Sequence, residues 1–358
     1  MRSGHGIRWV VFWLLACVIL FQCPAVAGEA ALCAPGDTAS IAPTVVQPSI
    51  FHPLSPPARQ IESLAWLVMG ICAGIFVIVE GLLVFSIVRF RRRSMESGEP
   101  VQLYGSNPIE LAWTVVPLLI VFTLGLVTIR VIRDVERETP PEGALEVICI
   151  GHQWWWEYRY ENPLSPQGEI VVANELHVPV GRPVWLRLES ADVIHSWWVP
   201  SLAGKMDVVP NKTNHVWFVA EEPGLYLGQC AEYCGNQHAG MLLRVNATSP
   251  EEFDQWLSHQ ASKPVDEPAV AAGKSIFLEL ACRTCHTVAG VSDGAFAPDL
   301  THLMSRATIA SGVSPLNRQT LRSWIDDPQN MKPGCNMPSL KLTTDELDDV
   351  TAFLCTLK

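Results

Sequence analysis

The chain has 358 residues, of which 49% are hydrophobic and 17% are charged, and its formal net charge is -11. This length exceeds one typical domain, and the composition is too apolar for an ordinary soluble protein, so membrane segments must account for the excess. The sequence has no lysine- and arginine-rich stripe that would indicate a nucleic acid as partner, and no glycine-rich phosphate loop.

The first 27 residues have the pattern of a secretory signal peptide. A basic start is followed by an apolar stretch over 9–21 and by small residues over 25–27. We therefore expect a signal peptide over 1–27 that is removed from the mature protein. A lipid anchor at Cys23 is the alternative, and the bulky Gln22 before it argues against such an anchor.

Two later runs of apolar residues are long enough to cross a bilayer. The runs cover 64–88 and 109–129, and each has at least the roughly 20 residues that a membrane-spanning helix needs. The sequence thus predicts transmembrane helices over 61–90 and 108–132, joined by a loop over 91–107.

The basic residues around that loop predict the orientation in the membrane. Arg89 and three arginines at 91–93 lie between the two runs, whereas the mature segment before them, 28–60, has only Arg59. The positive-inside rule places the loop in the cytoplasm, so 28–60 and everything after the second span lie on the periplasmic side of a bacterial inner membrane. Glu80, inside the first run, either marks a helix interface or is tolerated at a subunit contact.

Beyond residue 134 the pattern changes to short β-type segments, separated by turns rich in proline and glycine. The predicted strands cover 144–150, 169–173, 183–189, 215–220 and 241–246. They predict an all-β Greek-key sandwich of the cupredoxin kind over 143–249. Ser249 and Glu252 form a capping-box pattern for a short helix to about residue 259, within a helix-and-linker segment over 250–268.

A cluster of metal-binding residue types lies at 230–241. Cys230, Cys234, His238 and Met241 offer two thiolates, an imidazole and a thioether, a set that selects copper. Two cysteines separated by three residues suit two thiolates that bridge two copper ions, and His195 is the candidate for a second imidazole. The alternative is a disulfide between the cysteines in an oxidising compartment.

A second motif, about forty residues later, predicts a covalent haem. Cys282 and Cys285 are spaced to form thioethers with one porphyrin, and His286 then follows as the proximal iron ligand. A disulfide or half of a zinc site is the alternative. Met337, on a loop held by proline and glycine, is the candidate for the sixth ligand because a Met/His pair raises the potential and closes the iron; Met331 and Met304 are its competitors.

The haem motif lies in an all-α region over 269–358. Predicted helices cover 271–280, 321–326 and the stretch from a cap at Thr343 to the C-terminus, which is typical of a class I cytochrome c domain. Cys335 and Cys355 fall outside the ligand set, and whether they form a disulfide stays open.

These features together resemble subunit II of the haem-copper cytochrome c oxidases. The resemblance rests on the segment 151–156, which reads Gly-His-Gln-Trp-Trp-Trp, the segment 195–197, the loop 230–241 and the two spans. The appended haem motif makes the chain similar to members with a fused cytochrome c domain. The fold class implied is a multidomain membrane protein with a two-helix transmembrane hairpin, a cupredoxin-like sandwich and a class I cytochrome c domain.

The resemblance also implies roles for individual residues. Cys230 and Cys234 would bridge a binuclear copper centre, CuA, with His195 and His238 on one copper each and Met241 as a weak ligand. The main-chain carbonyl of Glu232 would be the last ligand, and its side chain would point to a magnesium ion at the junction with subunit I.

Three further residues take roles from the same resemblance. Trp154 matches the residue that admits electrons from an external cytochrome, although many relatives have tyrosine at the next position, Trp155. Pro298 resembles the proline whose carbonyl orients the haem histidine, or is only a turn residue. Glu110 matches the mouth of a proton channel in subunit I, and a solvated acid at a helix start is the alternative.

The expected function is electron entry into a terminal oxidase. Electrons from a cytochrome c donor would pass through the haem to CuA and on to the haem of subunit I, where oxygen reduction is coupled to proton pumping. A CuA subunit of a nitric oxide reductase is the first alternative, and a membrane protein for copper delivery or redox sensing is the second. A copper-free quinol-oxidase subunit is a third, against which Cys230, Cys234 and His238 argue directly.

Overall fold

The computed structural model describes residues 44–91, 102, 104–161, 168–264 and 267–358. The predicted signal peptide, residues 28–43 of the predicted periplasmic segment 28–60, and residues 92–101 and 103 of the predicted loop 91–107 lie outside the described residues. The described residues belong to one structural unit.

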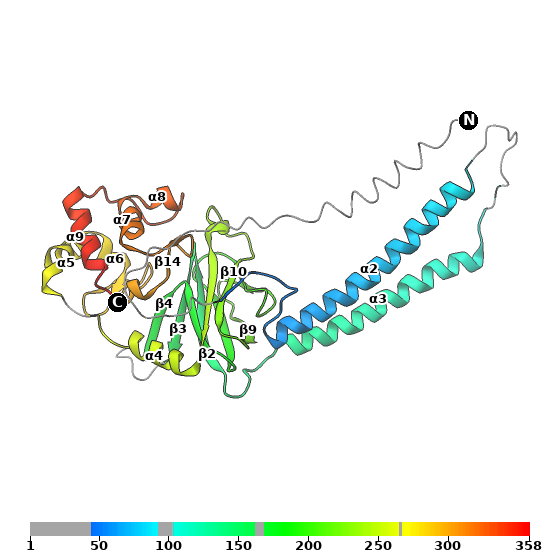
Figure 1. Cartoon of the computed structure of the whole chain (residues 1–358), viewed down its shortest axis with the longest axis horizontal. Helices are drawn as coiled ribbons and strands as arrows, with labels where there is room; N and C mark the ends of the chain where they lie inside the picture. Colours follow the sequence, from blue (N-terminus) through cyan, green and yellow to red (C-terminus); the bar gives the residue numbers. More distant parts are fainter. Residues whose placement is uncertain (1–43, 92–101, 103, 162–167, 265–266) are drawn as a thin grey trace. The chain divides into compact units, whose positions relative to one another are not determined.

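Two long helices come first in the chain, α2 (Pro56–Arg89) and α3 (Asn107–Val135). Both are long and apolar enough to cross a membrane, and they contact each other (Figure 1). Each begins earlier than predicted, because a proline in the first turn needs no hydrogen-bond partner and favours helix initiation there. α3 also runs past residue 132 to Val135, so the polar turn after the apolar run continues the helix.

The central region is a sandwich of two β-sheets, as predicted. The first sheet has the strand order β4-β3-β2-β6-β9. Its strands are β2 (Leu145–His152), β3 (Trp155–Glu161), β4 (Glu169–Ala173), β6 (Pro183–Ser190) and β9 (Asn214–Val219). The second sheet has the order β5-β11-β10-β7-β8, with β1 also paired to β10. Its strands are β1 (Val45–Val46), β5 (Glu175–Pro179), β7 (His195–Trp198), β8 (Met206–Val208), β10 (Gly224–Cys230) and β11 (Leu242–Thr248).

The core of the sandwich lies between the inward faces of the two sheets. Alternate residues of β11, namely Leu243, Val245 and Ala247, are buried, as expected for a strand with one face on a core. Trp197 of β7 stacks on Phe218 of β9, with ring centroids 5.7 Å apart, and so joins the sheets. β2 pairs with β6 in parallel, so the chain crosses over between them, as parallel pairing requires.

Helix α4 (Pro250–Gln260) follows the sandwich, and its predicted capping box is present. The Ser249 side chain accepts a hydrogen bond from the Glu252 amide, and the Glu252 carboxylate accepts one from the Ser249 amide. Trp256 packs from this helix against Tyr160, at 5.3 Å between ring centroids, and stacks on His177 at 4.3 Å. The helix therefore covers one end of the first sheet and the edge strand β5.

The C-terminal domain is helical and has its own core. Its helices are α5 (Ala271–Glu279), α6 (Cys282–Cys285), α7 (Arg318–Asp326), α8 (Pro328–Met331) and α9 (Thr344–Leu354). Short strands pair β12 (Thr287–Val288) with β13 (Ser292–Asp293) and β14 (Thr308–Ile309) with β15 (Ser314–Pro315). Single 3-10 turns lie at Pro268–Val270 and Leu303–Ser305. Another, at His238–Gly240, belongs to the sandwich and lies between β10 and β11.

Two details of this domain differ from or extend the sequence analysis. α7 begins at Arg318 rather than residue 321, because the side chain of Asn317 accepts hydrogen bonds from the amides of Gln319 and Thr320 and starts the helix there. Cys335 and Cys355 are both free thiols.

Candidate functional site

The two cysteines of the loop 230–241 lie side by side beneath the end of the sandwich. Cys230 is the last residue of β10, and the loop returns to the sheet at β11. The sulfur atoms of Cys230 and Cys234 are 3.8 Å apart, and both residues are buried. Both are free thiols, so the two cysteines do not form the disulfide that was the alternative.

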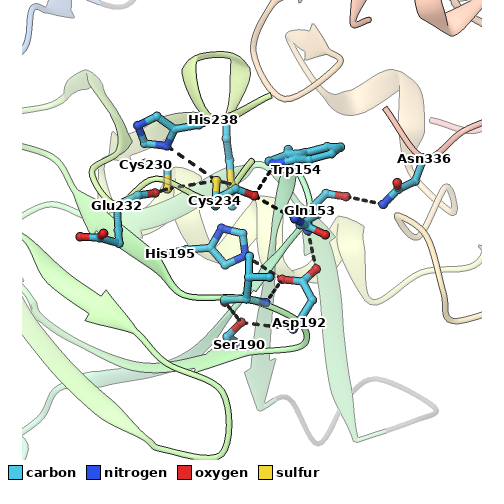
Figure 2. Close-up of polar contacts among 12 residues, drawn as sticks. Gln153, Trp154, Ser190, Asp192, His195, Cys230, Glu232, Cys234, His238 and Asn336 are labelled. Atoms are coloured by element: carbon cyan, nitrogen blue, oxygen red, sulfur yellow. Dashed lines mark hydrogen bonds and ion pairs between the residues drawn. The ribbon is translucent and has the colours of Figure 1, made fainter. Parts of the chain in front are cut away.

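His195 completes a compact group of metal-binding atoms. It begins β7, which pairs with β10 so that Trp197 lies opposite Cys230. One nitrogen of His195 and the two sulfur atoms all lie within 4.8 Å of one another (Figure 2). Sheet pairing thus brings together residues that are 35 positions apart in the sequence.

The ring of His195 is held in one orientation. Its Nε2 lies 2.8 Å from the Asp192 carboxylate, whose other oxygen accepts a hydrogen bond of 2.6 Å from the Gln153 amide. Among the described residues, His195 Nδ1 has no hydrogen-bond partner, although the side chain is fully buried. A buried nitrogen without a partner is costly unless something else binds it. A metal ion at the sulfur pair would satisfy it.

The other predicted copper ligands surround the same sulfur atoms. His238 Nδ1 is 3.7 Å from the sulfur of Cys234, and the thioether of Met241 is 4.0 Å from it. The sulfur of Cys230 lies 3.3 Å from the Glu232 main-chain carbonyl. The Glu232 side chain is exposed and points away from the sulfurs, as Figure 2 shows. All six predicted residues are therefore brought to one place.

The two thiols are strongly coupled. The hydrogen bond from Cys234 lowers the pKa of Cys230 well below its usual range, while the same hydrogen bond raises the pKa of Cys234. The coupling thus favours loss of a proton from one sulfur of the pair. A metal would be bound by the deprotonated sulfurs, because the thiolate and not the thiol is the ligand. Two thiolates, two imidazoles and a thioether are a donor set that fits copper.

Trp154 and Gln153 contact the main chain of the loop 230–241 at Cys234. The Trp154 indole and the Gln153 side-chain amide both donate to the main-chain carbonyl of Cys234, over 2.9 Å and 2.8 Å. Trp154 is only 8% exposed, so its ring is not open to a soluble partner in this chain. The predicted electron-entry residue is thus hydrogen-bonded to the main chain of Cys234 but lies beneath the surface.

The haem motif is organised by hydrogen bonds to its own histidine. Cys282 and Cys285 begin and end α6 as free, half-buried thiols, and His286 follows directly. Nδ1 of His286 lies 2.7 Å from the Pro298 carbonyl, so Nδ1–H donates and Nε2 is left for a metal. Pro298 therefore does orient this ring. Two free thiols beside a histidine held in this way fit a covalently bound haem.

Met337 lies in the segment 332–338, which is not helical. Its carbonyl accepts a hydrogen bond from the Gln329 side chain over 3.2 Å, and its side chain is half-buried. The role of Met337 as an iron ligand stays a prediction.

Glu110 lies in the first turn of α3. Its carboxylate accepts a hydrogen bond of 3.3 Å from the Ser106 amide, next to the helix start. This is the geometry of the helix-start acid that was the alternative to a proton-channel role, and the channel role stays a prediction.

Sequence reasoning missed two residues that shape the copper site, Asp192 and Gln153. Asp192 lies three residues before His195, and this close spacing of a carboxylate and a histidine is the signal that was available. No local pattern indicates Gln153, because its contacts with Asp192 and Cys234 join segments 39 and 81 positions apart.

Comparison with known proteins gives three matches in chain order. The family model for the transmembrane domain of cytochrome c oxidase subunit II matches residues 43–131, the one for its periplasmic domain matches 145–248, and the cytochrome c model matches 270–358. These matches imply CuA copper in the sandwich and a haem in the C-terminal domain.

Individual relatives agree with the family models. Cytochrome c oxidase subunit 2 of Alkalihalophilus pseudofirmus is 33% identical over 314 residues, covering 86% of this chain and 90% of the relative. The same subunit of Bacillus subtilis is 32% identical, covering 76% and 82%. The crystal structure of the periplasmic domain of subunit II from Bradyrhizobium japonicum is 30% identical, covers 34% of this chain and 96% of that chain, and has a TM-score of 0.32. The chain belongs to the cytochrome c oxidase subunit II family and carries a cytochrome c domain at its C-terminus.

Proposed function

We propose that this chain takes electrons from a periplasmic cytochrome c donor at its own haem c and delivers them through CuA to the haem of subunit I. Oxygen reduction coupled to proton pumping takes place in that partner subunit. The observation that carries the proposal is the convergence of His195, Cys230 and Cys234, whose ligand atoms lie within 4.8 Å of one another. The metals supply the redox chemistry, and the residues of the chain position them.

In this proposal each ligand has a defined task. Cys230, Cys234, His195, His238, Met241 and the Glu232 carbonyl would hold the copper, which would supply one-electron redox chemistry. Cys282 and Cys285 would hold the haem covalently, and His286 and Met337 would bind its iron. The outward direction of the Glu232 side chain supports a role as a magnesium ligand at the junction with subunit I.

The position of Trp154 decides how electrons reach the copper. Trp154 is 8% exposed, and its indole donates a hydrogen bond to the carbonyl of Cys234. The ring is therefore poorly placed to contact an external cytochrome and take electrons from it directly. We infer that Trp154 accepts electrons from the fused haem domain instead. The soluble donor then meets the haem domain, and Glu110 stands at the cytoplasmic end of the assembly with subunit I.

Metal analysis and spectroscopy of the purified full chain test this proposal. We expect two copper ions and one low-spin haem per chain, with a mixed-valence copper signal in electron paramagnetic resonance. A chain with no copper, or with one, would contradict the CuA assignment and the respiratory role. Co-purification of an oxygen-consuming subunit I separates an oxidase from a nitric oxide reductase, and a mixed-valence signal excludes a copper-delivery protein.

A further inference from the structure

Lys332 is a buried charge at the contact between the haem domain and the sandwich. It is 4% exposed. Its ammonium lies 2.7 Å from the carbonyl of Trp154, 2.9 Å from that of Gly240 and 3.3 Å from that of Ala310. An ammonium has three hydrogens to donate, and here it has three acceptors. The first two carbonyls belong to the sandwich, although Lys332 belongs to the haem domain.

Further hydrogen bonds surround this contact. The Ser311 hydroxyl lies 2.8 Å from the Trp154 carbonyl, and the Leu242 amide donates to the Ser311 carbonyl over 3.3 Å. The Asn336 side chain donates to the Gln153 carbonyl over 2.9 Å (Figure 2). The segment that carries Met337 is therefore bonded directly to the segment that contacts the copper loop.

A second buried charge crosses the contact in the opposite sense. Glu175, on β5 of the sandwich, is 4% exposed. Its carboxylate accepts hydrogen bonds from the amides of Ala307 and Thr308 and from the Thr308 hydroxyl, over 2.8–3.1 Å. Each domain thus places one charged side chain among main-chain groups of the other. A buried charge is tolerated only when it is fully hydrogen-bonded. Both charges depend on main-chain groups of the other domain for these bonds, so the two domains need each other at this contact.

The two domains also approach each other closely through glycine. Gly312 has a φ of +87°, and a Cβ there would lie 3.2 Å from Leu242 of the sandwich. Gly334 has a φ of +82°, and a Cβ there would lie 3.2 Å from Asn236 in the copper loop. Only glycine combines this backbone conformation with this close approach.

We propose that Lys332 is a positioning residue, whose ammonium fixes the segment 332–338 against Trp154 and the copper loop. This inference rests on the proposed function, because it assigns to that contact the task of holding the haem at a constant distance from CuA. The haem domain is then a docked part of the molecule rather than a domain that moves as a shuttle between donor and copper. Lys332 reaches the copper loop through the carbonyls of Trp154 and Gly240, so it acts through these residues and not on the metal.

The test uses the full chain in the intact oxidase complex, with Lys332→Met as the variant. Methionine keeps an unbranched apolar stem but removes all three donors. Lys341→Met is the matched control, because Lys341 is an exposed lysine of the same domain. Two quantities are measured: hydrogen exchange at the Leu242 amide, which bonds across the contact, and the rate of electron transfer from haem to CuA.

For Lys332→Met we expect at least about tenfold faster exchange at Leu242, as follows from losing charged hydrogen bonds. We also expect at least about tenfold slower electron transfer, with unchanged haem and CuA spectra. The control should match the wild type in both quantities. Wild-type values for exchange and electron transfer in Lys332→Met would overturn the inference.

A second variant keeps the inference testable if Lys332→Met fails to assemble. Ser311→Ala removes one hydroxyl at the same contact, and the same two changes are expected at smaller size. Wild-type behaviour of Ser311→Ala would then overturn the inference. Failure of the proposed function looks different, because electrons would not pass from haem to CuA even in the wild type, while hydrogen exchange would still report the docking.

Discussion

At the scale of single residues, the ring of His195 has one nitrogen in use and one free. Asp192 bonds Nε2 at 2.8 Å, and Nδ1 has no hydrogen-bond partner among the described residues. A carboxylate that bonds the outer nitrogen of a metal-binding histidine fixes its orientation and increases its basicity. The same contact, with two main-chain amides, lowers the pKa of Asp192 against the effect of burial, so the carboxylate is charged at neutral pH.

This geometry predicts graded effects of two substitutions. His195→Asn removes the ligand and should abolish the mixed-valence copper signal while the haem bands remain. Asp192→Asn keeps the ligand but weakens its support, and copper affinity should fall roughly 10–100-fold. Copper titration followed by paramagnetic resonance measures both. If the copper signal survives His195→Asn unchanged, the ligand assignment is wrong.

His177 is the second residue with a measurable consequence, here for acid stability. It is half-buried between Trp256, on which it stacks at 4.3 Å, and Asn246, whose amide donates to its Nε2 over 3.3 Å. Burial lowers the pKa of His177 to about 3. The unfolded chain takes up a proton at its ordinary value near 6.5.

The sign of the pH dependence follows from these two values. Between about pH 6.5 and pH 3 the unfolded state binds a proton at His177 that the folded state does not. The free energy of unfolding therefore falls as the pH falls through this window, by at most about 1.4 kcal/mol per pH unit from this group. His177→Gln should give a shallower loss of stability between pH 6.5 and 4 in thermal unfolding, whereas the exposed His52→Gln should not. An identical slope in wild type and His177→Gln would contradict the assignment.

At the scale of elements, α5 and α9 cross at close range in the core of the haem domain. A Cβ at Gly273 would lie 2.0 Å from the Asp349 carbonyl and 2.9 Å from Phe353. The helices therefore meet backbone to backbone at this residue, and Phe277 packs on Phe353 one turn further along, at 5.6 Å between ring centroids.

Gly273→Ala should force these helices apart. We expect a loss of about 1–3 kcal/mol in the stability of the haem domain, as is typical of an overpacked core. Denaturant unfolding followed by the haem absorption band measures this loss, and the copper signal should persist until the sandwich itself unfolds. Ser275→Ala, on the exposed side of the same helix, is the matched control and should change stability little.

The strands of the sandwich show which elements could be predicted from the sequence. The predicted strand 169–173 coincides with β4. The predicted strand 183–189 begins with β6 and is one residue shorter at its end. Turns with proline or glycine mark where these strands begin. The strands β1, β3, β5, β7, β8 and β10 were not predicted. β3 begins inside the segment 151–156 that was interpreted as a motif, and β10 contains two glycines that weaken a strand pattern. Most candidate ligands could be predicted together because their spacing is local in the loop 230–241, whereas His195 lies 35 positions before Cys230.

At the scale of the whole molecule, local patterns gave the order of the parts but not the contacts between them. Glu175 and Lys332 look like ordinary surface charges in the sequence, yet both are buried at the contact of sandwich and haem domain. Glu175 bonds Thr308, 133 positions away, and Lys332 bonds the carbonyl of Trp154, 178 positions away. Such pairs depend on how complete domains pack, which no short window of sequence contains.

The distribution of lysine provides a whole-molecule test of the proposed orientation. Every lysine of the chain, from Lys205 to Lys358, follows the second span, and the loop between the spans is basic through arginine alone. If the two spans place the loop in the cytoplasm, all lysines and the mature amino terminus lie on the periplasmic side. An amine-reactive reagent that cannot cross membranes should therefore label the chain in intact spheroplasts.

Inverted membrane vesicles give the opposite expectation. The same reagent should leave the chain unlabelled there until detergent opens the vesicles, and mass spectrometry should then find the modification at exposed lysines such as Lys263 and Lys341. Buried Lys332 should stay unmodified in the folded chain on either side and become reactive only after denaturation. Labelling in sealed inverted vesicles would reverse the orientation and place both metal domains in the cytoplasm, where covalent haem attachment and electron entry from a periplasmic donor would be ruled out.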